Sequence, residues 1–269
     1  MTPDSFFSAL WRQYTELTPQ ADRIHQALQA RGEKVLNDHV AFRTFNLAPM
    51  RLETLEPHLL ALGYTPLEPY RFPGKHLEAW GYLPKDPEQP RVFLSELQTE
   101  ALPDDCQAII QRLVEQVDPT AVNQPEFFFR GLPWEMPSRA EYLRLAEVSE
   151  YAAWMSVMGM RANHFTVAVH SLQSFGDLEA VNQFIRQDVG LPLNQSGGEI
   201  KGGPEVFLAQ SSTLADETRL HFSDGTEMAV PTCFYEFAQR YRLPDQSLYQ
   251  GFVANNADRI FESTDRRSA

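Results

Sequence analysis

The chain has 269 residues, of which 43% are hydrophobic and 22% charged, a composition typical of a globular protein and unlike a disordered or low-complexity chain. Its formal net charge of −13 argues against binding along the phosphate backbone of a nucleic acid. No apolar run approaches the ~20 residues that span a membrane, no signal peptide is visible and two cysteines make no disulfide framework, so we predict a soluble cytoplasmic protein with no nucleic-acid or membrane partner.

The first part of the chain reads as a helix followed by a strand, a helix and three more strands. Apolar residues at helical spacing predict a helix over residues 3–31, which Gly32 ends. A second helix-like stretch covers residues 50–62. The strand candidates are short and bounded by proline or glycine, and they cover residues 35–45, 65–71, 77–83 and 91–97.

The second half repeats this order after a mostly helical insert. Within the insert, Ser138 and Glu141 have the spacing of a capping box, which predicts the start of a helix. A further helix is expected over residues 178–189, before Gly190. The strand candidates of this half cover residues 161–170, 199–201, 205–210, 218–222 and 227–237.

A repeat of more than 100 residues is too long for a solenoid and suits the duplication of a half-domain. We therefore predict a single α+β metalloenzyme domain over residues 1–269. Its expected parts are an N-terminal helix (1–32), a first half (33–103), a helical insert (104–160), a second half (161–243) and a C-terminal tail (244–269).

One short motif occurs in both halves, and it carries a histidine each time. The strands Asn37-Asp38-His39-Val40-Ala41-Phe42 and Ala162-Asn163-His164-Phe165-Thr166-Val167 are alike, and a later apolar strand contains Glu236. A glutamate in such a strand is costly to bury unless it is paired or bound to a metal. Two histidines and one carboxylate leave about three open positions on a divalent ion, as in non-haem Fe(II) oxygenases, although the same ligands also suit Zn²⁺.

Other polar side chains are candidates for contact with a substrate. His39, Ala41 and Arg43 share one face of a strand, and a guanidinium near the metal would anchor a carboxylate. Lys201 and Gln210 are further candidate substrate contacts. Glu96 occupies roughly the place in the first half that Glu236 has in the second, which makes it a possible fourth ligand, although the neighbouring Ser95 aligns about as well.

Taken together, these segments resemble the 2-oxoadipate dioxygenase/decarboxylase family over nearly the whole chain. The segments that carry the resemblance are Asp38-His39-Val40-Ala41-Phe42-Arg43-Thr44, Asn163-His164-Phe165-Thr166, Ile200-Lys201-Gly202-Gly203-Pro204-Glu205, Phe234-Tyr235-Glu236-Phe237 and the tail Asn256-Ala257-Asp258-Arg259-Ile260-Phe261-Glu262-Ser263-Thr264.

The resemblance implies a vicinal oxygen chelate type fold, with two βαβββ half-domains that form a curved sheet around a metal site, and extra helices. It implies Fe(II) held by His39, His164 and Glu236, and Arg43 on the distal carboxylate of the substrate. The implied reaction converts 2-oxoadipate and O₂ to 2-hydroxyglutarate and CO₂, a step of lysine catabolism.

Two other functions remain open at this point. The same scaffold supports metal-dependent hydrolases, lyases and isomerases, because a fold does not fix a function, and Zn²⁺ or another divalent metal would serve them. A small-molecule binding module without catalysis is the third hypothesis. Dependence of turnover on O₂ and Fe(II) separates the oxygenase from the hydrolases, lyases and isomerases, whereas tight ligand binding without turnover would favour the binding module.

Overall fold

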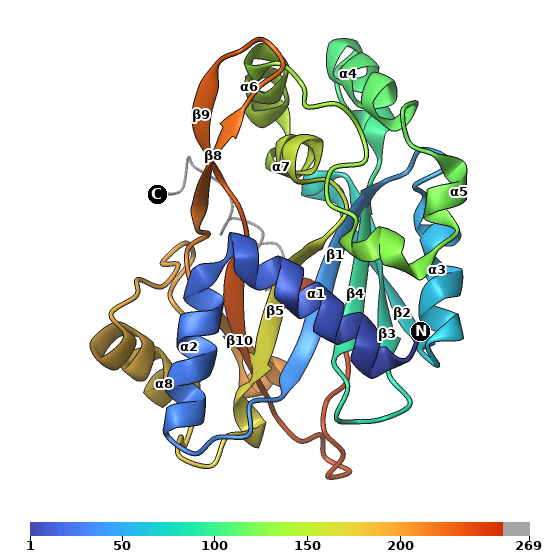
Figure 1. Cartoon of the computed structure of the whole chain (residues 1–269). Helices are drawn as coiled ribbons and strands as arrows, with labels where there is room; N and C mark the ends of the chain where they lie inside the picture. The colour runs from blue at the N-terminus through green and yellow to red at the C-terminus, as the bar shows by residue number, and fades with distance from the viewer. Residues whose placement is uncertain (255–269) are drawn as a thin grey trace.

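An eight-stranded mixed sheet forms the centre of the computed structural model, which describes residues 1–254 (Figure 1). Its strand order, β2-β3-β4-β1-β5-β10-β7-β6, is symmetric about the pair β1 and β5. The first half contains β1 (Asn37–Phe45), α3 (Leu52–Ala61), β2 (Thr65–Phe72), β3 (Leu77–Leu83) and β4 (Arg91–Leu97). The second contains β5 (Ala162–Ala168), α8 (Leu178–Phe184), β6 (Lys201–Gly203), β7 (Leu208–Ser212) and β10 (Phe234–Arg240). The predicted α+β fold with two βαβββ halves is therefore confirmed.

The remaining helices flank this sheet. Two precede it, α1 (Pro3–Leu17) and α2 (Pro19–Ala30), and the segment between the halves contains α4 (Asp104–Val114), α5 (Pro119–Val122), α6 (Arg139–Val148) and α7 (Glu150–Met158). Single 3₁₀ turns lie at Pro73–Lys75, Thr99–Ala101, Pro125–Phe129, Val169–Ser171 and Pro204–Val206, and a π-helical turn at Ile185–Val189 extends α8. The capping box at Ser138 and Glu141 begins α6 as predicted.

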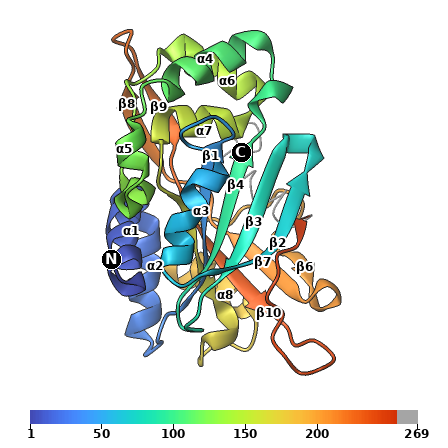
Figure 2. The same cartoon turned by 90° about the vertical axis from the view of Figure 1, so that its right-hand side faces the viewer.

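The sheet is curled, and its two faces have different partners. Helices α1 and α2 cover the outer face, while the two ends of the sheet bend away from them (Figures 1 and 2). On that outer face, Trp11 packs edge-on against Phe165 and close to Tyr235, with ring centroids 5.1 and 5.8 Å apart. Because side chains alternate along a strand, the residues next to Phe165 and Tyr235 point into the concave face.

The prediction of one continuous helix over residues 3–31 is wrong, because the helix is interrupted at Thr18. Thr18 has φ −134° and ψ 63°, outside the helical region, and Pro19 follows it as the first residue of α2. Proline disfavours the helical conformation of the preceding residue and lacks the N–H that would continue the hydrogen-bond series. The same proline suits the first turn of a new helix.

Two strand predictions in the second half also need correction. Residues 204–206 form a 3₁₀ turn and Phe207 has a left-handed φ of 60°, so β7 begins only at Leu208. The predicted strand 227–237 is two strands, β9 (Glu227–Pro231) and β10, which are separated at residues 232–233. With β8 (Glu217–His221), β9 forms a two-stranded hairpin of its own.

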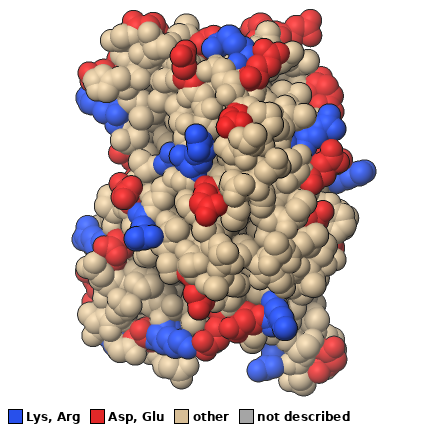
Figure 3. Space-filling view, turned by 45° about the vertical axis from the view of Figure 1, so that its right-hand side comes forward, with Lys and Arg blue, Asp and Glu red and all other residues tan. Residues whose placement is uncertain are grey.

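Acidic and basic side chains are interspersed with uncharged ones over the face of the molecule in Figure 3. On that face neither the acidic nor the basic side chains gather into one large patch. Within residues 1–254, no helix has both the length and the apolar character needed to cross a bilayer.

Candidate metal centre

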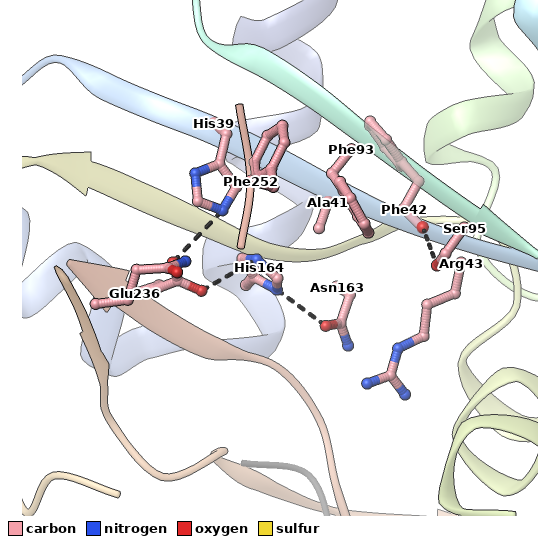
Figure 4. Close-up of a pocket in the computed structure, with 11 residues that line it drawn as sticks. His39, Ala41, Phe42, Arg43, Phe93, Ser95, Asn163, His164, Glu236 and Phe252 are labelled. Carbon is pink, nitrogen blue, oxygen red and sulfur yellow. Dashed lines mark hydrogen bonds and ion pairs between the residues drawn. The ribbon is translucent and has the colours of Figure 1, made fainter. Parts of the chain in front are cut away.

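Three neighbouring strands each supply one side chain to a compact polar cluster on the concave face. His39 lies on β1, His164 on β5 and Glu236 on β10 (Figure 4). In the sheet register Glu236 lies opposite Thr166, which in turn lies opposite His39, so the cluster crosses three strands at one level. One ligand atom from each side chain lies within 4.8 Å of the others, and this group could hold a metal ion.

The residue that precedes each histidine orients its ring. Oδ1 of Asp38 lies 2.8 Å from Nδ1 of His39, and Oδ1 of Asn163 lies 3.0 Å from Nδ1 of His164. An oxygen in that place accepts a hydrogen bond from a protonated Nδ1, which leaves the unprotonated Nε2 directed at Glu236. Each ring is therefore held in the tautomer that a metal ligand requires.

Asp38 also belongs to a buried ion-pair network. Its two carboxylate oxygens accept hydrogen bonds from Arg240 at 2.7 and 2.8 Å, and Nη1 of Arg91 lies 3.4 Å away. Burial alone would raise the pKa of the Asp38 carboxyl, but Arg240, the hydrogen bond from His39 and Arg91 together hold that pKa well below its usual range. Asp38 is thus a fixed negative charge behind the His39 ring.

Glu236 is fully buried and only partly satisfied. Its Oε1 accepts a hydrogen bond of 2.6 Å from Nε2 of Gln210, whereas its Oε2 has no hydrogen-bond partner within the described chain. Burial raises the pKa of the Glu236 carboxyl, although His39 and Gln210 act in the opposite direction. A buried carboxylate oxygen without a partner is costly, and a cation at that oxygen would satisfy it.

The electrostatics of His164 fit the same cation. Its Nε2 lies 3.3 Å from Oε2 of Glu236, and Nε2 of His39 lies 3.5 Å from Oε1. Burial, together with the charges of His39 and Arg43, lowers the pKa of His164 well below its usual value. A neutral imidazole is the form that binds metals. The three residues therefore fit a divalent ion in chemistry and in placement.

A cavity opens beside this cluster and extends to Arg43. Arg43 is 1% exposed and lies further along β1 than His39, as Figure 4 shows. Between the two, the cavity wall is mostly apolar. The remaining lining residues are Ala41, Phe42, Phe93, Ser95, Asn163, Gln210 and Phe252.

The two other candidate substrate contacts, Gln210 and Lys201, lie at the Glu236 end of the site, on β7 and β6. Gln210 lines the cavity, but its side-chain amide is directed at the Glu236 carboxylate. Lys201 lies opposite Gln210 in the pairing of β6 with β7, is 3% exposed and donates to the carbonyl of Asn194 at 3.0 Å. Gln210 is thus placed to orient Glu236, and Lys201 lies one strand further from β10 than Gln210 does.

Glu96 does not occupy the place of Glu236 in the first half. In the sheet register, Glu236 lies opposite Thr166, which is two positions after His164. The corresponding residue of the first half is Ala41, two positions after His39, and it lies opposite Phe93. Glu96 instead accepts a hydrogen bond of 2.9 Å from the backbone N–H of Leu52, at the start of α3. Phe93 fills the corresponding position, so the cluster has one carboxylate and not two.

Three residues of the site were missed in the sequence. Asp38 and Asn163 had a visible signal, because each directly precedes the histidine of the repeated motif. Phe252 had none: it belongs to the predicted tail, yet its ring lies 5.0 Å from the His39 ring and lines the cavity. The tail motif at residues 256–264 lies outside the described residues.

The chain matches one protein family over most of its length. The family model for 2-oxoadipate dioxygenase/decarboxylase matches residues 6–245. A curated Arabidopsis thaliana protein, "2-oxoadipate dioxygenase/decarboxylase, chloroplastic", is 33% identical over 97% of this chain and 78% of its own length.

Two solved structures are also similar. A crystal structure from Shewanella frigidimarina NCIMB 400 has a TM-score of 0.89 at 44% identity, over 94% of this chain and 98% of that one. The hydroxyglutarate synthase of Oryza sativa, crystallised in complex with 2-oxoadipate, has a TM-score of 0.90 at 32% identity, over 98% of this chain and 92% of that one. The resemblance noted in the sequence is confirmed.

Proposed function

Because the chain belongs to the 2-oxoadipate dioxygenase/decarboxylase family, we propose that it converts 2-oxoadipate and O₂ to 2-hydroxyglutarate and CO₂. The six carbons of the substrate become the five of the product and one CO₂. The observation that carries the proposal is a single cavity with a metal-binding group at one end and a buried guanidinium at the other. A 2-oxo dicarboxylate has matching chemistry at its two ends.

In this proposal His39, His164 and Glu236 hold Fe(II). Two neutral imidazoles and one carboxylate leave about three positions open on the ion, the arrangement of non-haem iron oxygenases. Iron, when bound there, would coordinate the 2-oxo acid group and activate O₂. Asp38 and Asn163 keep both Nε2 atoms available, and Gln210 holds the Glu236 carboxylate in place.

Arg43 binds the distal carboxylate of the substrate. A guanidinium pairs with a carboxylate through two parallel hydrogen bonds, which fixes the far end of the molecule as well as its charge. The apolar wall of Ala41, Phe93 and Phe252 would pack against the methylene chain and keep water from the reacting end. Direct contact of Lys201 or Gln210 with the substrate stays a prediction.

Oxygen uptake tests the reaction. Protein loaded with Fe(II) without air is mixed with 2-oxoadipate and O₂, and uptake, CO₂ and 2-hydroxyglutarate are measured. We expect equal amounts of O₂ consumed and CO₂ released. Turnover with Zn²⁺ in the absence of O₂ would instead indicate a hydrolase, lyase or isomerase on the same scaffold.

A substitution tests the anchor. We expect Arg43→Ala to raise KM for 2-oxoadipate by about tenfold or more, because a charge-assisted pair is lost, while KM for 2-oxohexanoate, which lacks the distal carboxylate, changes little. Equal effects on the two substrates would remove Arg43 from that role.

A cytoplasmic location and a part in lysine catabolism complete the proposal. Cys106 and Cys233 are both free and buried, which suits a reducing compartment. The curated Arabidopsis relative carries a chloroplastic name, so fractionation of the native host, followed by detection of the protein, decides the compartment.

A further inference from the structure

The guanidinium at the far end of the cavity already has a carboxylate partner from its own chain. Nη1 of Arg43 donates a hydrogen bond of 2.8 Å to Oε1 of Glu150. The Arg43 side chain is 1% exposed and that of Glu150 is 17% exposed. An arriving substrate carboxylate would therefore meet a cation that is already neutralised.

The surroundings of Arg43 limit where a second carboxylate can bind. The guanidinium carbon lies 4.9 Å from the ring centre of Tyr151 and 5.0 Å from that of Trp154. Aromatic rings hold a guanidinium through its faces, whereas carboxylates bind in its plane. Glu150 and a substrate carboxylate would thus share the edge positions of one buried cation.

Glu150 is held beside Arg43 without help from a ligand. It is the first residue of α7, and the next residue, Tyr151, places its hydroxyl 2.8 Å from the carbonyl oxygen of Ser95 and 3.1 Å from that of Thr44. These contacts fix the start of α7 to β4 and β1. A helix N-terminus also stabilises a negative side chain in its first turn.

We propose that Glu150 is an internal competitor for the substrate carboxylate at Arg43, and so helps to set the affinity for dicarboxylates. The inference rests on the proposed role of Arg43 as substrate anchor. In the ligand-free protein Glu150 neutralises the buried guanidinium. When a dicarboxylate binds, the two carboxylates repel each other at close range, and the partly exposed Glu150 is the one that can turn toward water.

This competition predicts two effects of opposite sign when the charge of Glu150 is removed. The ligand-free protein loses stability, because Arg43 becomes a buried charge without its carboxylate. The affinity for a dicarboxylate rises, because the competing charge is gone. An ion pair with a purely structural role would give the first effect and not the second.

The test uses Zn²⁺-loaded protein without O₂, so that ligands bind without turnover, and titration calorimetry with 2-oxoadipate and 2-oxohexanoate. We expect Glu150→Gln to bind 2-oxoadipate about fivefold more tightly, as expected for about 1 kcal/mol of repulsion, and 2-oxohexanoate as the unsubstituted protein does. Glu147→Gln is the matched control, because it makes the same change in charge on the exposed side of α6. It should leave both affinities unchanged.

Unchanged or weaker binding of 2-oxoadipate to folded Glu150→Gln protein would overturn the inference. If that variant does not fold, Glu150→Asp keeps the charge but withdraws it by one methylene, and it should tighten binding to a smaller degree; no tightening overturns the inference equally. A separate Arg43→Gln titration distinguishes the two proposals. If it leaves the preference for 2-oxoadipate over 2-oxohexanoate intact, the anchor itself fails and the inference falls with it.

Discussion

At the scale of single residues, the candidate metal centre depends on pairs of consecutive side chains. Asp38 and Asn163 differ in charge, yet each presents an oxygen to the Nδ1 atom of the following histidine. The carboxylate behind His39 is fixed by Arg240, whereas the amide behind His164 adds no charge. The two rings are thus oriented alike, but only His39 has a negative charge behind it.

The three proposed ligands can be tested individually. We expect His39→Ala, His164→Ala and Glu236→Ala each to abolish stoichiometric Fe(II) binding, because two ligands cannot hold the ion against water. Metal content per folded protein chain, measured after dialysis, checks this. His221→Ala is the control, since the His221 side chain is 80% exposed on the β8–β9 hairpin. Full occupancy in any of the three variants would remove that residue from the ligand set.

Glu236 is expected to lower the free energy of unfolding of the metal-free protein. Its carboxylate is buried with one unbonded oxygen, Oε2, and the nitrogen of a glutamine amide in the place of that oxygen could donate to the nearby Nε2 of His164. We expect Glu236→Gln to raise the free energy of unfolding of metal-free protein by about 1 kcal/mol. Urea unfolding in the presence of a chelator measures it. A less stable variant would show that Glu236 is satisfied without a metal.

At the scale of elements, the symmetry of the two halves explains the composition of the site. Strand β1 corresponds to β5 and β4 to β10, and the pairing of β1 with β4 and that of β5 with β10 are both parallel. Each half places a histidine on its first strand, but only the second half places a carboxylate on the parallel strand beside it. Phe93 takes that position in the first half and becomes a wall of the cavity.

A glycine on β3 is expected to act on the cavity through Phe252. A Cβ built at Gly81 would lie 3.2 to 3.3 Å from the rings of Phe252 and Tyr70, which must move apart to admit it. We expect Gly81→Ala to lower the free energy of unfolding by about 1–3 kcal/mol and to raise KM, because Phe252 is displaced. Gly74→Ala is the control, since a methyl group added there would have no atom within 4 Å. Unchanged stability and KM for Gly81→Ala would contradict this.

The sequence predicts the face of a strand on which a side chain lies, because this depends on local periodicity. It does not predict which residues meet across strands, because this depends on the pairing of distant segments. Alternation along β1 correctly placed His39, Ala41 and Arg43 on one cavity. The first-half counterpart of Glu236 could not be found in this way, because it depends on the register between β1 and β4. The position of Phe252 could not be predicted from a periodic pattern either. Its segment is held by hydrogen bonds from Arg240 to the backbone carbonyls of Tyr249 and Gly251, which are contacts between distant parts of the chain.

At the scale of the whole molecule, the metal would join the two halves. His39 belongs to the first half, while His164 and Glu236 belong to the second, and the three meet where β1 pairs with β5. A bound ion therefore adds a link between two units that also meet through the antiparallel pair of β1 with β5 and through the ion pair of Asp38 with Arg240. Any ligand that binds only the folded state stabilises it in proportion to the logarithm of its concentration over its dissociation constant.

Removal of the metal should accordingly lower the melting temperature. At a free metal concentration of about one hundred times the dissociation constant, binding contributes about 2.7 kcal/mol, which for a chain of this size corresponds to roughly 5–10 °C. We expect a chelator to lower the melting temperature of the unsubstituted protein by that amount, and added Fe(II) without air to restore it. Glu236→Gln protein should melt at one temperature with and without metal, because its site cannot close. A metal that is bound in stoichiometric amount yet leaves the melting temperature unchanged would contradict a site that only the folded chain builds.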